Sequence, residues 1–188
     1  MDIPYHIIIT TDLIPGQSMV QIEVQQGSIL EATCEAIVNA ANSQGWMGGG
    51  VAGAIKRAAG LQVEEEAVRQ APTPVGGAIV TSGGKTGFRG IIHAPTMERP
   101  AMRIPVENVG KATAAALRLA EASGFATIAL PGMGTGVGGV DHQAAAVSMI
   151  AAIRQFPAGR LQRVLLVDVD PAMVAAWRRA LADRRVAP

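Results

Sequence analysis

The segment Ala36–Gly60, AIVNAANSQGWMGGGVAGAIKRAAG, joins an apolar run to a helical stretch through two asparagines and three consecutive glycines. The apolar run favours a short buried strand, and the residues after the glycines have helical composition. Gly48, Gly49 and Gly50 permit positive φ and close approach of another group to the backbone. Backbone N–H groups at the helix start would face such a group, and the helix dipole favours an anion there. The pattern therefore predicts a pocket for a phosphate and a sugar.

A plainer interpretation of the same segment is a strand-to-helix turn that the two asparagines cap. Asn39 and Asn42 follow a buried strand, where side-chain amides need hydrogen-bond partners. A single glycine-rich loop leaves both interpretations open. The loop is not a Walker loop, because no Gly-Lys-Ser/Thr closes it, and it lacks the Rossmann G-x-G-x-x-G spacing.

The length and charge of the chain limit its class. With 188 residues, 49% hydrophobic and 16% charged, residues 1–188 suit one well-buried domain. The formal charge of +1 does not favour a nucleic-acid backbone as the main partner, and no apolar stretch reaches the length of a membrane span. Asp2 precedes the first apolar run, which is atypical of a secretory signal, so the expected location is cytoplasmic.

Apolar and β-branched runs alternate with helical segments after two opening strands. This order predicts an α/β fold, a three-layer α/β/α sandwich around a mixed sheet. The predicted strands are 6–10, 19–25, 36–39, 78–82, 91–94, 127–130 and 163–169. The predicted helices are 51–59, 62–70, 106–123, 142–154 and 171–184, the last with Asp170 as N-cap.

A second glycine loop, residues 131–139, follows the predicted strand 127–130 and has the sequence PGMGTGVGG. Such a loop can present consecutive N–H groups to a diphosphate, and Thr135 adds a hydroxyl donor. Ligands of open α/β sheets bind at the carboxyl ends of the strands, where both loops leave. The two loops are therefore predicted to hold one ligand from opposite sides; two unrelated tight turns are the alternative.

Taken together, these motifs resemble the signature of macrodomains. The resemblance rests on Asn39-Ala40-Ala41-Asn42, Gly48-Gly49-Gly50-Val51, Ala54-Ile55, Leu130-Pro131 and Gly134-Thr135-Gly136-Val137, and it extends over nearly the whole chain. Macrodomains are α/β/α sandwiches that bind ADP-ribose, and some remove ADP-ribose from modified side chains or hydrolyse related esters. The resemblance thus implies binding of ADP-ribose or an ADP-ribosylated protein.

The resemblance also implies roles for individual residues. Asn42 is expected to bond the distal ribose and is the best catalytic candidate, while Asn39 either fixes the loop or contacts the ligand. The expected ligand-binding residues are Ser28, Ile29, Asn39, Asn42, Gly48, Gly49, Gly50, Val51, Ala52, Gly134, Thr135, Gly136, Val137, Gly138 and Val167.

Four of these positions depart from the family pattern. Ser28 replaces an aspartate that commonly recognises adenine, and a serine lacks the carboxylate's charge-assisted hydrogen bond. Ala52 replaces an aspartate that activates water in many hydrolytic members. Gly138 replaces an aromatic residue that covers the distal ribose, and Val167 one that stacks on adenine. Trp46 and Phe88 are the nearest loop aromatics that could compensate, although a tryptophan packed on the surface is the simpler expectation for Trp46.

These departures leave the enzymatic question open. Binding of ADP-ribose is the leading hypothesis; removal of ADP-ribose from acidic side chains or deacetylation of O-acetyl-ADP-ribose is the second, using a substrate phosphate or a positioned water. Binding of RNA or another nucleotide is a third. The three histidines and Cys34 show no metal-ligand spacing, so neither metal nor cofactor is expected. His93 is expected to be a hydrogen-bonded core residue and Cys34 a structural one.

Overall fold

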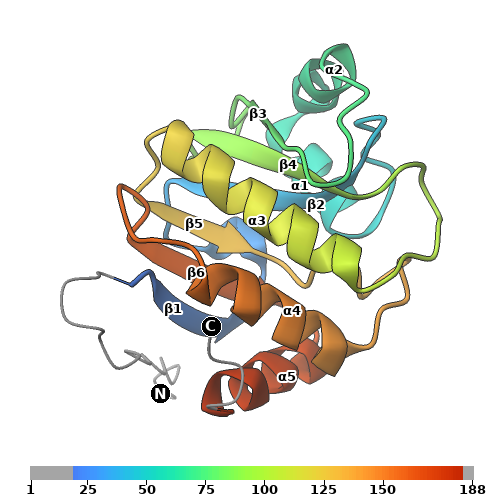
Figure 1. The fold of residues 1–188 in the computed structure, drawn as a ribbon. Helices are drawn as coiled ribbons and strands as arrows, with labels where there is room; N and C mark the ends of the chain where they lie inside the picture. The colour runs from blue at the N-terminus through green and yellow to red at the C-terminus, as the bar shows by residue number, and fades with distance from the viewer. Residues whose placement is uncertain (1–18, 184–188) are drawn as a thin grey trace.

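A computed structural model describes residues 19–183 as a six-stranded sheet with helices on both faces (Figure 1). The strand expected at residues 6–10 lies outside the described residues. The strands are β1 (Gln21–Gln26), β2 (Ala36–Asn42), β3 (Ile79–Thr81), β4 (Gly90–Met97), β5 (Thr127–Leu130) and β6 (Arg163–Asp168). The helices are the 3-10 turn η1 (Ile29–Glu31), α1 (Gly50–Ala59), α2 (Leu61–Arg69), α3 (Glu107–Ala122), α4 (His142–Arg154) and α5 (Pro171–Ala182).

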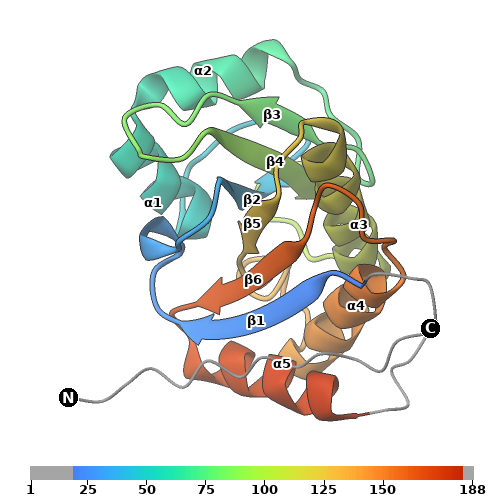
Figure 2. The same cartoon turned by 90° about the vertical axis from the view of Figure 1, so that its left-hand side faces the viewer.

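The sheet has the strand order β1-β6-β5-β2-β4-β3, and only β3 runs antiparallel to its neighbour. Figure 2 shows α1 on one side of the sheet and α3 and α4 on the other. Helix α5 shares a core with α3 and α4, and α2 shares the second core with α1, so each face of the sheet is covered by helices. The predicted three-layer α/β/α architecture with a mixed sheet is therefore confirmed.

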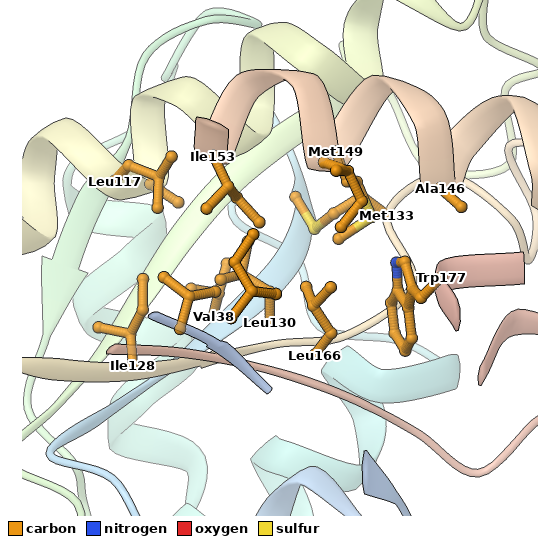
Figure 3. Packing of buried hydrophobic residues seen from close by; sticks show 14 of the residues in the cluster. Val38, Leu117, Ile128, Leu130, Met133, Ala146, Met149, Ile153, Leu166 and Trp177 are labelled. Atoms are coloured by element: carbon orange, nitrogen blue, oxygen red, sulfur yellow. The ribbon is translucent and has the colours of Figure 1, made fainter. Parts of the chain in front are cut away.

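Both faces of the sheet bury apolar side chains, which explains why its strands read as nearly continuous apolar runs. Along β6, Val164 and Leu166 join the core beneath α3, α4 and α5, while Leu165 and Val167 join the core beneath α1. Figure 3 shows Leu166 beside Trp177 in the first of these cores. This alternation fixes which face each residue of β6 presents.

Helices α4 and α5 begin at side-chain caps. Asp141 and Asp170 accept hydrogen bonds from the N–H groups of Ala144 and Ala172, at 2.9 and 2.8 Å, and so cap α4 and α5. Pro171 occupies the first turn of α5, as predicted.

The central strands extend further than the sequence predicts. β2 continues to Asn42 rather than ending at Asn39, because Asn39 pairs with His93 of β4 and an irregularity after Ala41 lets Asn42 pair with Met97. The pairing brings the first asparagine inside the sheet and leaves the second at its carboxyl edge. No helix in residues 19–183 is long and apolar enough to cross a membrane.

Candidate functional site

A cleft of about 670 Å³ runs across the carboxyl edge of the parallel strands. Its walls come from the loops that follow β1, β6, β5, β2 and β4, in that spatial order. Because the strand order fixes the order of the loops, the cleft has one end beside β1 and β6 and another beside β2 and β4. All but one of the predicted ligand residues line it: Ser28, Ile29, Asn42, Gly48, Gly49, Gly50, Val51, Ala52, Gly134, Thr135, Gly136, Val137, Gly138 and Val167.

The first glycine loop presents bare backbone to the cleft. A Cβ atom added to Gly48, Gly49 or Gly50 would meet no atom within 4 Å, so these residues border open space. Gly50 has φ +56, and α1 begins there without a side-chain cap. The N–H groups of the first helical turn have no partner within the helix, and they carry the positive end of its dipole. This wall of the cleft can therefore bind an anion without any cationic side chain.

In the second glycine loop, Gly136 has free space for a side chain, whereas Gly134 and Gly138 do not. A Cβ atom on Gly136 would meet nothing within 4 Å, whereas one on Gly138 would lie 2.6 Å from the carbonyl oxygen of Gly134. Gly134 has φ +76, and the side chain of Ile104 packs against it. The loop path therefore requires glycine at position 138, which explains in physical terms why an aromatic residue is missing there.

Asn42 holds its own loop in shape. Its Nδ2 donates to the carbonyl oxygen of Trp46 at 2.8 Å, and its Oδ1 accepts from the N–H of Gln44 at 3.1 Å. The side chain also lines the cleft, so a ligand contact would add to these bonds. The roles of Asn42 in ribose binding and in catalysis stay predictions.

Asn39 is the predicted ligand residue that does not line the cleft. It is buried on β2, and its Nδ2 lies 3.1 Å from Nδ1 of His93. The side chain thus ties β2 to β4, and the role that the sequence analysis offers as the alternative, fixing the loop, stays a prediction.

His93 is a hydrogen-bonded core residue, as predicted. Its Nε2 lies 3.0 Å from Oγ1 of Thr81, and burial lowers the pKa of its imidazole to about 4, although the carboxylate of Glu66 opposes this shift. The neutral ring accepts at Nδ1 from Asn39 and donates at Nε2 to Thr81. His93 is thus neutral near pH 7 and structural.

At the β1 and β6 end, Ser28 caps η1 by accepting from the N–H of Leu30 at 3.2 Å. Val167 is only 1% exposed and packs beneath α1, whereas Val169, two residues later, is 70% exposed on the cleft wall. Of the two valines, Val169 therefore presents the larger surface to a ligand.

The sequence prediction missed three polar residues at this end of the cleft, Asp168, Asp170 and His142. Asp168 Oδ2 accepts from the N–H of Gly132 at 2.9 Å. Asp170 Oδ2 lies 3.0 Å from His142 Nε2, which links the first residue of α4 to the cap of α5. A carboxylate at the end of an apolar strand was the available signal for Asp168.

At the β2 and β4 end, Trp46 lines the cleft with 51% of its surface exposed, and both expectations for it, packing on the surface or compensating for a missing ring, stay predictions. Met97, the last residue of β4, and Pro100 and Ala101 after it complete this end and were also missed. Phe88 does not line the cleft; it borders a separate hollow with Cys34. Burial raises the pKa of the Cys34 thiol to about 12, which suits the structural role predicted for it.

Within residues 19–183 no group of three or more His, Cys, Asp or Glu side chains could hold a metal ion. The cleft contains glycine backbone on two walls, an amide and an indole at one end, and carboxylates with an imidazole at the other. These groups suit an extended ligand with a polar centre and flat or apolar ends.

Comparison with known proteins identifies the family. The family model for the Macro domain matches residues 38–149. The chain belongs to the macrodomain family. An uncharacterized protein of Aquifex aeolicus is 54% identical over 163 residues, which are 87% of this chain and 99% of that protein. A protein of Escherichia fergusonii named O-acetyl-ADP-ribose deacetylase is 38% identical over 144 residues, 72% of this chain and 80% of that protein.

Solved macrodomain structures share the fold. The Oceanobacillus iheyensis macrodomain, in a glycine-to-valine mutant with ADPR, has a TM-score of 0.80 and 25% identity, covering 94% of this chain and 97% of that one. The Trypanosoma brucei macrodomain in complex with ADP-ribose has a TM-score of 0.77 and 25% identity, covering 86% of this chain and 69% of that one.

Proposed function

We propose that this macrodomain binds ADP-ribose, either free or attached to a protein, in the cleft at the carboxyl edge of its sheet. The observation that carries the proposal is the pair of glycine loops, whose positions Gly48 to Gly50 and Gly136 border open space within one cleft. Two bare backbone walls accommodate a diphosphate between them. The relatives that bind ADP-ribose, named above, support the same ligand.

The order of the loops suggests how the ligand lies. The base would occupy the β1 and β6 end, beside Ser28, Ile29 and Val169, where a backbone turn and apolar surface suit a purine. The diphosphate would lie between the glycine loops, and the second ribose would reach Asn42 and Trp46 at the other end. Each part of the ligand thereby meets groups of matching polarity.

The charge of the cleft also favours a small diphosphate over a nucleic acid. No lysine or arginine occurs among the lining residues of the described chain, so anion binding would rest on backbone N–H groups and the α1 dipole. A polynucleotide contact usually relies on several cationic side chains and is strongly salt-dependent. RNA is therefore the weaker candidate.

Isothermal titration calorimetry with ADP-ribose tests the proposal. Binding should be measurable with ADP-ribose, weaker with ADP, and absent with a short RNA. An absence of heat at millimolar ADP-ribose would overturn it. NAD belongs in the same series, because it carries a bulky group on the second ribose.

Hydrolysis is a second candidate function, favoured by the resemblance to the protein named O-acetyl-ADP-ribose deacetylase. Ala52 lines the cleft in the first turn of α1 and cannot accept a proton. The cleft carboxylates, Asp168 and Asp170, lie at the β1 and β6 end, away from the second ribose in the orientation proposed above. Hydrolysis would therefore use a phosphate of the substrate or a water held by Asn42.

Incubation with O-acetyl-ADP-ribose and with a mono-ADP-ribosylated protein, followed by mass spectrometry, separates the two functions. Unchanged substrate after many hours would leave binding alone. A cytoplasmic location and a single macrodomain over residues 1–188 remain predictions that accompany this proposal.

A further inference from the structure

Within residues 19–183, only two aromatic rings line the cleft, the indole of Trp46 and the imidazole of His142. His142 lies at the β1 and β6 end, where Asp170 holds its Nε2 at 3.0 Å. Trp46 follows β2 and lies at the opposite end. The two rings are therefore placed to meet different parts of an extended ligand.

The exposure of Trp46 sets it apart from the other tryptophan of the chain. Trp177 is completely buried in the core, whereas Trp46 is 51% exposed. Covering part of this apolar surface with a ligand would be favourable, because it removes the surface from water. The free surface of the indole is thus available to a ligand.

The backbone on both sides of the indole is held in place without a ligand. The carbonyl oxygen of Trp46 accepts from Asn42 Nδ2 at 2.8 Å, and the next N–H, that of Met47, donates to Glu64 Oε2 at 2.6 Å. Lys56 pairs with the same carboxylate at 3.1 Å, and the Met47 side chain is fully buried. A loop fixed in this way loses little backbone entropy when a ligand binds.

The opposite wall cannot supply a ring. A Cβ atom on Gly138 would lie 2.6 Å from the carbonyl oxygen of Gly134, so no side chain fits there without moving the loop. The neighbouring Val137 is 62% exposed and offers an aliphatic surface only. At the β2 and β4 end, Trp46 is therefore the aromatic group that can cover a bound sugar.

We infer that Trp46 recognises the terminal ribose of the ligand, packing its indole against the apolar face of the sugar, and that it makes the site prefer ADP-ribose to ADP. The inference rests on the proposed function. A sugar presents C–H groups on one face and hydroxyls at its rim, and an indole provides a flat apolar partner for that face. Ligands that lack the terminal ribose do not reach this contact.

A matched set of titrations tests the inference. ADP-ribose and ADP are each titrated by calorimetry into the unmodified protein, Trp46→Ala and Trp46→Phe. We expect Trp46→Ala to weaken ADP-ribose binding about tenfold, from the usual strength of an aromatic contact, and to leave ADP binding unchanged. Trp46→Phe should recover most of the loss. Because the indole is half exposed, the variants should keep the melting temperature of the unmodified protein.

Fluorescence gives a second readout that a purely structural role would not change. ADP-ribose should alter the tryptophan emission of the unmodified protein, and ADP should not. In Trp46→Phe the buried Trp177 alone remains, so the ligand-dependent change should disappear.

The results separate the inference from the function on which it rests. If the unmodified protein binds neither ADP-ribose nor ADP, the proposed function fails. The inference is overturned if the unmodified protein binds ADP-ribose and Trp46→Ala binds ADP-ribose with the same affinity. It is also overturned if Trp46→Ala loses affinity for ADP to the same extent as for ADP-ribose. A third result would also overturn it: Trp46→Ala keeps its affinity for free ADP-ribose but no longer binds an ADP-ribosylated protein. The indole would then contact the carrier protein and not the ribose.

Discussion

Asp168 Oδ2 accepts a hydrogen bond from the backbone N–H of Gly132 at 2.9 Å, which ties the end of β6 to the start of the second glycine loop. The other carboxylate oxygen accepts from the N–H of Asp170 at 2.9 Å. One side chain thus fixes a wall of the cleft and the approach to α5. Charge-assisted hydrogen bonds of this kind are stronger than neutral ones.

Replacing Asp168 by alanine should therefore loosen the cleft as well as destabilise the fold. Two backbone N–H groups lose their acceptor, and we expect a loss of about 2 kcal/mol in the free energy of unfolding. ADP-ribose affinity should fall several-fold because the loop is less well ordered. Urea denaturation and calorimetry measure the two effects, and Asp168→Asn, which keeps one acceptor oxygen, should fall between. Unchanged values in Asp168→Ala would show that the loop holds itself.

Gly136 and Gly138 offer a matched comparison within one loop. Gly136→Val should keep the melting temperature, since its side chain enters open space, but lower ADP-ribose affinity at least about tenfold by filling the cleft. Gly138→Ala should destabilise the fold by about 1 to 3 kcal/mol, because its methyl group meets the Gly134 carbonyl oxygen. Thermal melts and calorimetry on both variants test this division, and the reverse pattern would contradict it.

The architecture and the convergence of the two glycine loops could be predicted from sequence because each depends on local patterns. The Asp170-Pro171 pair marks a helix start, and parallel strands place their carboxyl ends, with both loops, at one edge. The hydrogen-bond partners of Asn42 could not be predicted, because a side-chain amide can bond a ligand or its own loop equally well.

The missed residues depend on the order of strands in the sheet. Asp168 is far in sequence from Gly132, and they meet only because β6 lies between β1 and β5. The crowding at Gly138 likewise follows from the path of the loop past Gly134 and not from its composition. Long-range proximity of this kind leaves no periodic signal in one sequence.

Ala52→Asp tests whether the cleft lacks only a proton acceptor for hydrolysis. The new carboxylate would lie in the first turn of α1, where the helix dipole favours it, but Ala52 is buried, so the carboxylate also pays a desolvation cost and a thermal melt must accompany the rate measurement. We expect the variant to release ADP-ribose from a modified protein faster than the unmodified chain. Ala52→Asn has nearly the same shape and no general base, so it should stay at the original rate. Equal rates in both variants would show that a carboxylate at this position does not activate water.

His93 should make stability depend on pH. Burial lowers the pKa of its imidazole from 6.5 to about 4, so the folded protein favours the neutral ring while the unfolded chain takes up a proton near pH 6.5. The stability that His93 contributes is therefore complete above pH 6.5 and is lost as the pH falls toward 4, by roughly 3 kcal/mol in total.

Urea denaturation at several pH values should show this loss in the unmodified protein and not in His93→Gln. Glu66, the carboxylate that acts on this imidazole, is present in both proteins, so the difference between their pH profiles isolates the histidine. Parallel profiles would mean that the folded protein protonates His93 as readily as the unfolded chain does.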